Sequence, residues 1–436
     1  MKIAIDGFNL GLAQGTGIAT YGRELASVLE KSGNEVFPIY GLDIAKRDEQ
    51  LFYSQFIQRL GVSGESDKRS LINWAGRFLS GFPSHILGRP FNVDRVATNR
   101  QIALGSVRDK LPVCTEILNS SSIFKVSQAY SVLTKQPTKL SLPVEVDLLH
   151  LTLPLPLSIS KVPKAVTVHD IIPLILPSST KVNIPRYTSM LRTALRDADV
   201  IFSVSECSKR DVVQFLNIPE QRIHVTYQSV DIPEQLKNIT QDECVQFLKN
   251  NYDLKFAEYF LYYGAIEPKK NVAKIIEAFS QAKTDCPIVI VGKDGWLFDD
   301  VQRLLQSAHM NSKGRKRFIR IPYLPFQQLM FLLRGARGLV FPSLYEGFGL
   351  PVLEAMQMGC PVITSHVSSL PEVGGEAVHY VDPYDTESIV SAVEKFSSDN
   401  EYRADLIKKG YVQAQKFSKS NYLKLLNHGY EKALSR

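Results

Sequence analysis

The strongest constraint on the fold is an alternation of short apolar runs with helical segments, which occurs twice along the 436 residues. The first series extends from Lys2–Asp6 to Ile223–Val225, and the second begins at Tyr259. A polar stretch at 231–253 separates the two. Strands and helices that alternate at these lengths are typical of a parallel sheet with helices on both faces. The pattern therefore predicts an α/β protein of two doubly wound, Rossmann-like domains that face each other across a cleft.

Breaks in this pattern set the expected domain limits. We expect a first domain over 1–235, with an insertion of mixed helix at about 42–140, where apolar and basic patches have no clean period. The second domain is expected over 255–415, and a C-terminal helix at 416–436 is expected to pack back on the first domain. A ligand of two such domains binds between the carboxyl ends of their strands.

Basic residues are concentrated in one part of the insertion. Between Gly64 and Leu140 there are eleven Lys and Arg residues against five Asp and Glu residues. Large apolar side chains lie in the same segment, namely Trp74, Phe78, Leu79, Phe82, Ile86 and Leu87. This combination suits an anionic membrane surface, and a solvated basic surface is the alternative interpretation. We do not expect nucleic acid as a partner.

The chain carries no sequence signal for export or for crossing a membrane. No apolar run reaches the roughly 20 residues of a spanning helix. The opening segment MKIAIDGFNL lacks the long apolar core of a signal peptide. The five cysteines are scattered without a CxxC pair, which favours reduced thiols. We therefore expect a cytoplasmic protein, peripheral on the inner face of the cytoplasmic membrane.

The most specific chemical motif is Glu346-Gly-Phe-Gly-Leu-Pro-Val-Leu-Glu354, which follows an expected strand and begins a helix near Leu350. Gly347 and Gly349 allow the backbone to approach a ligand closely. Free amides at the start of a helix favour an anion such as a diphosphate. Glu354, about one turn into the helix, can accept hydrogen bonds from ribose hydroxyls. The structural alternative is a tight turn with a surface glutamate.

Two adjacent lysines lie at an equivalent place earlier in the second domain. Lys269 and Lys270 follow the expected strand Tyr259–Ile266 and precede a helix that begins at Asn271. Cationic groups at this place in a doubly wound domain meet phosphate in the cleft. Taken alone, the pair is more typical of an exposed surface, but beside the glutamate motif it indicates phosphate binding.

A histidine marks the corresponding edge of the first domain. His169 ends the apolar strand Ala165–Val168, so it is expected to face the cleft. There it can donate a hydrogen bond to a sugar hydroxyl or to the leaving phosphate. The alternative is a core histidine paired with Asp170.

Two further motifs carry less information. Gly15 and Gly17 follow the first strand and open a helix, but the third glycine of a dinucleotide fingerprint is absent, which argues against a nucleotide-dependent oxidoreductase. Asp197 and Asp199 imitate a metal-binding DxD pair, but they end an expected helix, where carboxylates more often face solvent. We expect no metal and no cofactor, and no lysine is identified that would hold the pyridoxal group of a phosphorylase.

With these residues in view, the chain resembles the retaining glycosyltransferases of family 4, which have two Rossmann-like domains (the GT-B fold). Glu346 and Glu354 fit the family signature of two glutamates separated by seven residues. Gly264–Asn271 resembles the family's phosphate loop, although Ala265 stands where the usual Arg would be. The Glu-Pro-Lys-Lys-Asn segment of this loop is similar to the Glu-Pro-Arg-Lys-Asn version of some bacterial polysaccharide mannosyltransferases.

The resemblance implies roles for particular residues. It implies catalytic roles for His169, Glu346 and Lys270. The donor-binding residues that it implies are Lys269, Lys270, Glu346, Gly347, Phe348, Gly349, Leu350, Glu354, Gly15 and Gly17. Because a lysine is a point charge whereas arginine is a bidentate fork, Lys269 would neutralise a phosphate with a different geometry.

The implied reaction is metal-independent transfer of a hexose with retention of configuration. The donor favoured by the loop is GDP-mannose, and the acceptor is a growing, lipid-linked glycan of a bacterial surface polysaccharide such as O-antigen. A UDP- or dTDP-sugar donor, such as one carrying rhamnose or glucose, remains open. A non-catalytic sugar-nucleotide-binding protein is the further alternative.

Overall fold

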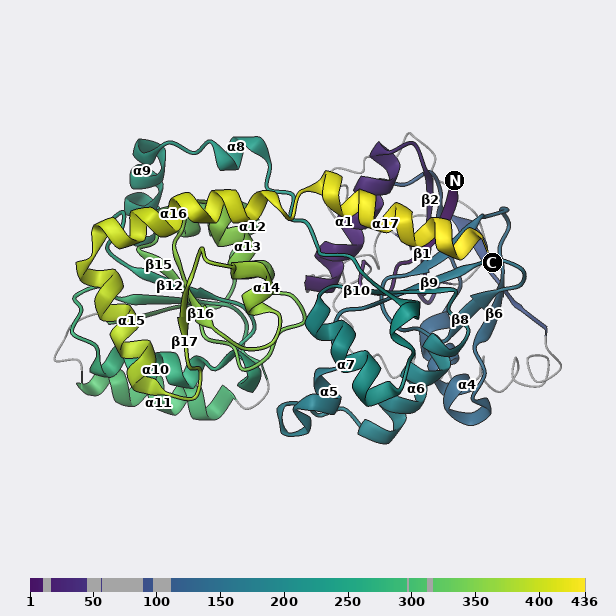
Figure 1. Ribbon diagram of the computed structural model, residues 1–436, viewed down its shortest axis with the longest axis horizontal. Helices are drawn as coiled ribbons and strands as arrows, with labels where there is room; N and C mark the ends of the chain where they lie inside the picture. The colour runs from purple at the N-terminus through teal and green to yellow at the C-terminus, as the bar shows by residue number, and fades with distance from the viewer. Residues whose placement is uncertain are drawn as a thin grey trace.

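The computed structural model describes residues 1–10, 17–44, 56, 89–96, 111–295, 298–311 and 317–435. Within these residues, two large sheets with their helices form two domains that lie side by side (Figure 1). The α/β class and the two Rossmann-like domains predicted from the sequence are confirmed.

The first domain contains an eight-stranded sheet with the order β11-β10-β9-β7-β1-β2-β5-β4, in which the β4–β5 pair is antiparallel and the other pairs are parallel. The strands of this sheet are β1 (Lys2–Asp6), β2 (Glu35–Tyr40), β4 (Asp94–Val96), β5 (Ile117–Asn119), β7 (Leu148–Leu151), β9 (Lys164–Val168), β10 (Val200–Ser203) and β11 (Ile223–Val225). The helices of this domain are α1 (Gly17–Lys31), α4 (Ile123–Thr134), α5 (Ile172–Ile175), α6 (Ile184–Arg196) and α7 (Glu206–Leu216), with short 3-10 turns at Pro177–Ser179 and Glu220–Arg222.

Local sequence explains the ends of these helices. In α1 the apolar residues at helical spacing are buried against the sheet, and the chain leaves the helix through Gly33, whose φ of 81° is left-handed. In α6 the Asn183 side chain caps the first turn by accepting a hydrogen bond from the Arg186 amide, and Pro185 occupies a position that needs no donor.

The expected insertion of mixed helix is wrong for the described part of 42–140. Besides α4, this part contains β4 and β5, which extend the large sheet, and β3 (Phe91–Asn92) and β6 (Thr138–Ser141). The last two form a small three-stranded sheet with β8 (Leu157–Ile159). Strands of two to four residues are too short to produce a readable alternation, so their pairing depends on distant partners.

The second domain contains a six-stranded, parallel sheet with the order β14-β13-β12-β15-β16-β17. Its strands are β12 (Phe260–Tyr263), β13 (Ile288–Val291), β14 (Phe318–Ile321), β15 (Gly338–Phe341), β16 (Val362–Ser365) and β17 (His379–Val381). Its helices are α8 (Glu234–Lys237), α9 (Gln241–Tyr252), α10 (Val272–Gln281), α11 (Phe298–Asn311), α12 (Phe326–Gly335), α13 (Leu350–Gln357), α14 (Leu370–Gly374), α15 (Thr386–Ser398) and α16 (Asn400–Gln415), with a 3-10 turn at Pro268–Lys270.

The polar stretch 231–253 is ordered in the structure and belongs to the second domain. It contains α8 and α9, and α9 begins with a capping box formed by Thr240 and Glu243. Cys244 and Leu248 on α9 are fully buried in the core of the second domain, where the helix packs against α12. The exposed side of α9 accounts for the polar composition, because a helix on a sheet buries only one face.

The chain crosses between the domains a second time after α16. Helix α17 (Lys419–Leu434) packs on α1, β9 and β10 of the first domain. In Figure 1 the two yellow helices α16 and α17 lie along one side of the molecule, one over each domain. The hydroxyl of Tyr430 on α17 lies 2.5 Å from Nδ1 of the buried His150. Within the described residues, no helix has both the length and the apolar character needed to cross a membrane.

Candidate active site

The loop between β15 and α13 carries the glutamate motif. Glu346 is buried there, and its Oε1 lies 2.6 Å from the Nζ atom of Lys270. Burial opposes ionisation of this carboxyl, but the charges of Lys270 and Lys269 outweigh it and hold its pKa below the usual value. The structure thus brings the predicted lysine pair and the first glutamate together as a charged cluster.

Lys269, the other lysine of the pair, interacts with charged groups of both domains. Burial alone would lower the pKa of Lys269, but the carboxylates of Asp170, Glu346 and Glu267 together raise it. Asp170 follows β9 of the first domain, and its Oδ1 accepts a hydrogen bond from the Ile172 amide at 3.1 Å. Lys269 therefore stays protonated at neutral pH, and it carries the charge needed beside a diphosphate.

The two glycines of the motif are required for different reasons. Gly349 precedes α13 with a φ of 118°, which a residue with a Cβ atom rarely adopts. Gly347 lies against the other domain, because a Cβ atom built there would lie 2.2 Å from the backbone oxygen of His169. The Gly347 carbonyl also accepts hydrogen bonds from Ser205 and Ser208 of the first domain, at 2.7 and 3.2 Å. The loop is thus in direct backbone contact with the opposite edge of the cleft.

Glu354 is buried in the first helical turns of α13. The hydroxyl of Tyr263, at the end of β12, donates a short hydrogen bond to its Oε2 and also lies 3.2 Å from the Pro351 carbonyl oxygen. Burial raises the pKa of Glu354 to about 7, although the tyrosine hydroxyl opposes the shift. A carboxyl that is half ionised near neutral pH can accept a hydrogen bond from a hydroxyl ligand more strongly once it loses its proton.

His169 occupies the expected position at the end of β9, but both of its ring nitrogens bind protein groups. Nε2 lies 2.8 Å from the carbonyl oxygen of Thr152, so it carries the ring proton and donates it there. Nδ1 then accepts from the side-chain amide of Gln228 at 3.1 Å. The ring of Tyr21 packs edge-on against the imidazole, with the centroids 4.7 Å apart. Burial lowers the pKa of His169, so the imidazole is neutral. Its hydrogen-bond partners are thus Thr152 and Gln228, whereas Asp170, the partner in the alternative interpretation, acts on the imidazole only through its charge.

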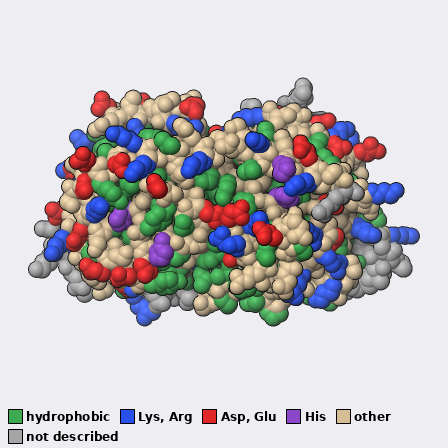
Figure 2. Space-filling model, viewed as in Figure 1, with side chains coloured by type: hydrophobic (Ala, Val, Ile, Leu, Met, Phe, Trp, Pro, Cys, Tyr) green, Lys and Arg blue, Asp and Glu red, His purple; other side chains and the backbone are tan. Residues whose placement is uncertain are grey.

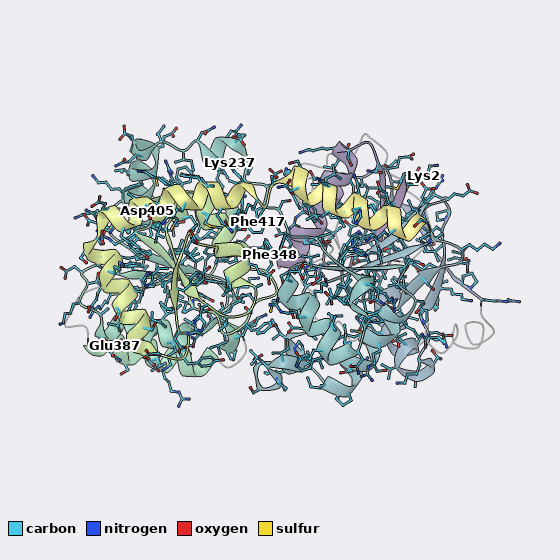
Figure 3. The ribbon with its side chains drawn as sticks, viewed as in Figure 1. Lys2, Lys237, Phe348, Glu387, Asp405 and Phe417 are labelled. Atoms are coloured by element: carbon cyan, nitrogen blue, oxygen red, sulfur yellow. The ribbon has the colours of Figure 1, made fainter. Side chains whose placement is uncertain are left out.

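The remaining predicted residues lie at the junction between the domains. Gly17 begins α1, and a Cβ atom built there would lie 3.6 Å from the Leu350 side chain, so these two predicted positions face each other across the domains. The Phe348 side chain is buried and packs against Phe417, with ring centroids 5.6 Å apart, and near Tyr227. Figure 3 labels Phe348 and Phe417 at the point where the chain crosses between the domains. Phe348 thus anchors the loop. Gly15 lies outside the described residues.

Several contacts at this junction involve residues that belong to no recognisable sequence motif. The Glu372 carboxylate accepts the backbone N–H groups of Glu206 and Cys207 at the start of α7, each at 2.7 Å. The hydroxyl of Tyr345 donates to Asp211. On the face shown in Figure 2, acidic and basic side chains gather where the two domains meet. Sequence reasoning also missed Tyr263 and Gln228, since their partners are 91 and 59 residues away.

The DxD-like pair lies at the opposite edge of the first sheet. Asp199 Oδ2 accepts the backbone N–H of Lys164 at 2.8 Å, and Asp197 lies 3.4 Å from the Nζ atom of the same buried lysine. Lys164 begins β9, so the pair is at the amino end of the strand, away from His169. These carboxylates neutralise a buried cation.

Comparison with protein families gives two matches. Residues 249–413 match the family described as glycosyl transferases group 1. Residues 120–233 match the family described as Glycosyltransferase Family 4. The first range contains the lysine pair and both glutamates of the motif, and the second contains His169.

Two curated relatives have names that state an activity. The O-antigen chain mannosyltransferase B of Escherichia coli is 33% identical over 264 residues, which are 58% of this chain and 66% of that protein. The serotype-specific mannosyltransferase WbdA of Escherichia coli is 31% identical over 61% of this chain and 33% of that protein. The chain therefore spans about two thirds of the first relative and about one third of the second.

Solved structures share the fold at low sequence identity. Sucrose-phosphate synthase from Thermosynechococcus elongatus superposes with a TM-score of 0.66 at 16% identity, covering 100% of this chain and 99% of that one. The Anabaena protein HepE, solved in complex with UDP and glucose, superposes with a TM-score of 0.62 at 15% identity, covering 99% of both chains. At these identities the likeness concerns the two-domain fold.

Proposed function

Since this chain belongs to glycosyltransferase family 4, we propose that it transfers a hexose from a nucleotide diphosphate sugar to a growing, lipid-linked glycan of a bacterial surface polysaccharide. The single observation that carries this proposal is the cluster of Lys269, Lys270 and Glu346 beside the start of α13. Its two cations and the positive end of the α13 dipole suit a departing diphosphate. His169 and Gly17 approach the same loop from the first domain.

The proposed reaction retains the configuration of the sugar. The bond between the anomeric carbon and the phosphate oxygen breaks, and a bond to the acceptor hydroxyl forms on the same face. The acceptor proton passes to the departing phosphate. Lys269 and Lys270 stabilise the charge that develops on the phosphate, so the step uses no metal. Glu346 keeps Lys270 in place through the contact between its Oε1 and the lysine Nζ.

In this proposal His169 does not act as a general acid. Its only ring proton is donated to Thr152, and burial keeps the ring neutral. Nδ1 is therefore an acceptor, and it can receive a hydrogen bond from a sugar hydroxyl only when the Gln228 amide moves away. We infer that His169 orients the donor sugar.

GDP-mannose is the proposed donor. The Glu-Pro-Lys-Lys-Asn loop and the two relatives named mannosyltransferases favour mannose. A UDP-sugar is the alternative, since HepE has a similar fold and was solved with UDP. Incubation with a panel of nucleotide sugars, followed by measurement of nucleotide diphosphate release, tests both. If the protein binds a nucleotide sugar but releases no nucleotide diphosphate with every acceptor tested, a non-catalytic binding protein is favoured instead.

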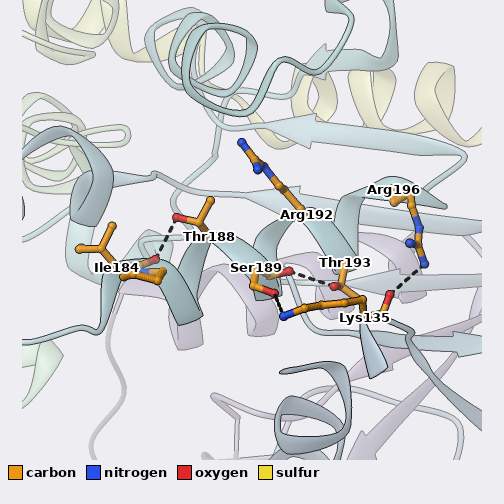
Figure 4. Close-up of a pocket in the computed structure, with 8 residues that line it drawn as sticks. Lys135, Ile184, Thr188, Ser189, Arg192, Thr193 and Arg196 are labelled. Atoms are coloured by element: carbon orange, nitrogen blue, oxygen red, sulfur yellow. Dashed lines mark hydrogen bonds between the residues drawn. The ribbon is translucent and has the colours of Figure 1, made fainter. Parts of the chain in front are cut away.

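The membrane part of the proposal is supported by a basic groove on the first domain. This groove, between the end of α4 and α6, has a volume of about 550 Å³ and is lined by Lys135, Arg192 and Arg196 (Figure 4). Leu133 and Val182 lie close to it in the sequence and are 61% and 45% exposed. Basic side chains with neighbouring exposed apolar groups suit an anionic lipid surface. Trp74 and the other large apolar residues at 74–87 lie outside the described residues.

Vesicle co-sedimentation tests this membrane contact. Three basic residues near an anionic surface contribute roughly 3 kcal/mol, so changing Lys135, Arg192 and Arg196 together to Gln should release most of the protein from anionic vesicles. The matched control changes three exposed lysines of the second domain, namely Lys249, Lys408 and Lys416. Equal recovery of the native protein with anionic and neutral vesicles would contradict the membrane contact and leave the proposed transfer reaction unaffected.

A further inference from the structure

The second domain has a groove that the proposed reaction does not use. It is bounded by α8, α9 and α12 and has a volume of about 400 Å³. Its floor is apolar, and the side chains around it are mostly amides. We call it the amide groove, and its amide residues are Gln235, Gln246, Asn250, Asn251 and Gln327.

Most of these amides have unused hydrogen-bonding capacity. Asn251 donates to the Phe247 carbonyl oxygen at 2.8 Å. In the part of the chain that the structure describes, no side-chain hydrogen bond is found for Gln235, Gln246, Asn250 or Gln327. Each free amide offers two donors and an acceptor, which is the complement of a ligand rich in hydroxyl groups.

The charge of the amide groove restricts the ligand further. Its single charged residue is Glu243, whose carboxylate is bound in the capping box by the amide and hydroxyl of Thr240 at 2.8 and 2.7 Å. Among the residues that the structure describes, no lysine or arginine lines the groove. A phosphorylated lipid, a nucleic acid or an acidic peptide would find no cation there, whereas an uncharged ligand meets no unpaired charge.

Aromatic rings form part of the floor. Phe247 on α9 and Phe331 on α12 stack with their centroids 4.1 Å apart and their planes at 20°, and both are only partly buried. The face of an aromatic ring carries partial negative charge, which attracts the slightly positive C–H groups of a sugar ring. Leu236 and Ile239 complete the floor, so the groove offers an apolar base with polar walls.

We propose that the amide groove binds a neutral glycan, a stretch of the polymer that the enzyme extends. This inference rests on the proposed function for the identity of the polymer. Helix α12 follows the carboxyl end of β14, and Gln327 lies in its first turn. The loop between β15 and α13, which carries Glu346, follows the carboxyl end of a strand in the same parallel sheet, so both lie at the same edge of that sheet. A chain held in the groove is bound to the same domain as that loop, which raises the effective concentration of its growing end.

Binding of a linear, uncharged manno-oligosaccharide to the full chain tests the proposal. Gln246→Ala combined with Asn250→Ala should weaken this binding about tenfold, because two hydrogen bonds between neutral groups are lost. Both residues are exposed on α9, so the fold is retained. The matched control is Gln241→Ala, an exposed amide on the same helix that lies outside the groove. Binding should also be insensitive to salt, since no charged pair contributes.

The second readout is the length of the product. With a long acceptor the double variant should make shorter chains, whereas its turnover with a short acceptor and its donor affinity should match the native protein. Equal oligosaccharide binding by the double variant and the Gln241→Ala control would overturn the proposal, as would binding that falls steeply with salt. Failure of the native protein to turn over any nucleotide sugar is a separate result, which would refute the proposed function.

Discussion

The pKa of the buried Glu354 carboxyl gives the protein a pH dependence that the variant Glu354→Gln should remove. Burial raises this pKa from 4.5 to about 7. Between these values the folded state holds a proton that the unfolded state has lost, so the contribution to stability is present at low pH and declines as the pH rises toward and through 7. Glutamine has the same shape and keeps an oxygen that can accept from Tyr263, but it does not titrate.

The size of the effect follows from the shift. A difference of about 2.5 pKa units corresponds to roughly 3 kcal/mol at 1.36 kcal/mol for each unit. The stability of the variant relative to the native protein should therefore increase by about 3 kcal/mol from about pH 4 to about pH 8. For a domain of this size that is a change of roughly 10 °C in the difference between the two melting temperatures. Melting curves of both proteins across this range measure it.

Donor binding should depend on the same proton. Ribose hydroxyls bind an ionised carboxylate more strongly, so the affinity of the native protein for the nucleotide should rise toward pH 7, by at most about tenfold for each pH unit. The Glu354→Gln variant, measured by calorimetry in the same buffers, accounts for the titration of the nucleotide itself. If the melting temperature and the nucleotide affinity depend on pH in the same way in both proteins, Glu354 is not a buried, titrating ligand of the donor.

Three further predictions concern the closed cleft and the charged cluster. Gly347→Ala should keep the domains apart and lower turnover by at least about tenfold, because its Cβ atom would lie 2.2 Å from the His169 oxygen. The control is Gly410→Ala on α16, where the nearest contact of the added Cβ atom is the Met356 side chain at 3.4 Å. A normal rate and an unchanged radius of gyration for the first variant would be inconsistent with this closed arrangement. Lys270→Ala should cost roughly 3–5 kcal/mol, because the buried Glu346 loses its ion-pair partner. Lys255→Ala, which removes an exposed pair with Glu258, should change the free energy of unfolding little. Transfer should continue in EDTA, because lysines and amides neutralise the phosphate. Loss in EDTA with recovery in magnesium would contradict this.

Local sequence was sufficient to predict most elements and the positions of the motifs. The strand at Lys2–Asp6 and the helix from Leu350 were read from short apolar runs and from Gly349 and Pro351, and the structure has them there. These features depend on residues a few positions apart, because side-chain periodicity and glycine conformation act within one turn or one strand. The carboxyl-edge positions of His169 and Lys270 followed from the same reasoning, since parallel strands present their ends at one edge.

The predictions that missed their target depended on distant partners. The cluster that the Phe348 ring forms with Tyr227 and Phe417 could not be anticipated, because it joins residues far apart in the sequence. The short strands within 89–141 could not be recognised, because each is defined only by the strand beside it. The polar stretch 231–253 was interpreted as a boundary, although one face of α9 is buried in the second domain.

The order of residues along the chain is enough to predict two parallel α/β domains, with acidic, basic and glycine residues at the carboxyl ends of their strands. The chemical state of those groups depends instead on the three-dimensional arrangement of the chain. His169 is a neutral acceptor because Thr152 takes its proton, and Glu354 titrates near neutral pH because the second domain buries it. Protonation depends on desolvation and on charges brought together from distant parts of the chain, and neither is encoded in the spacing of residues along it.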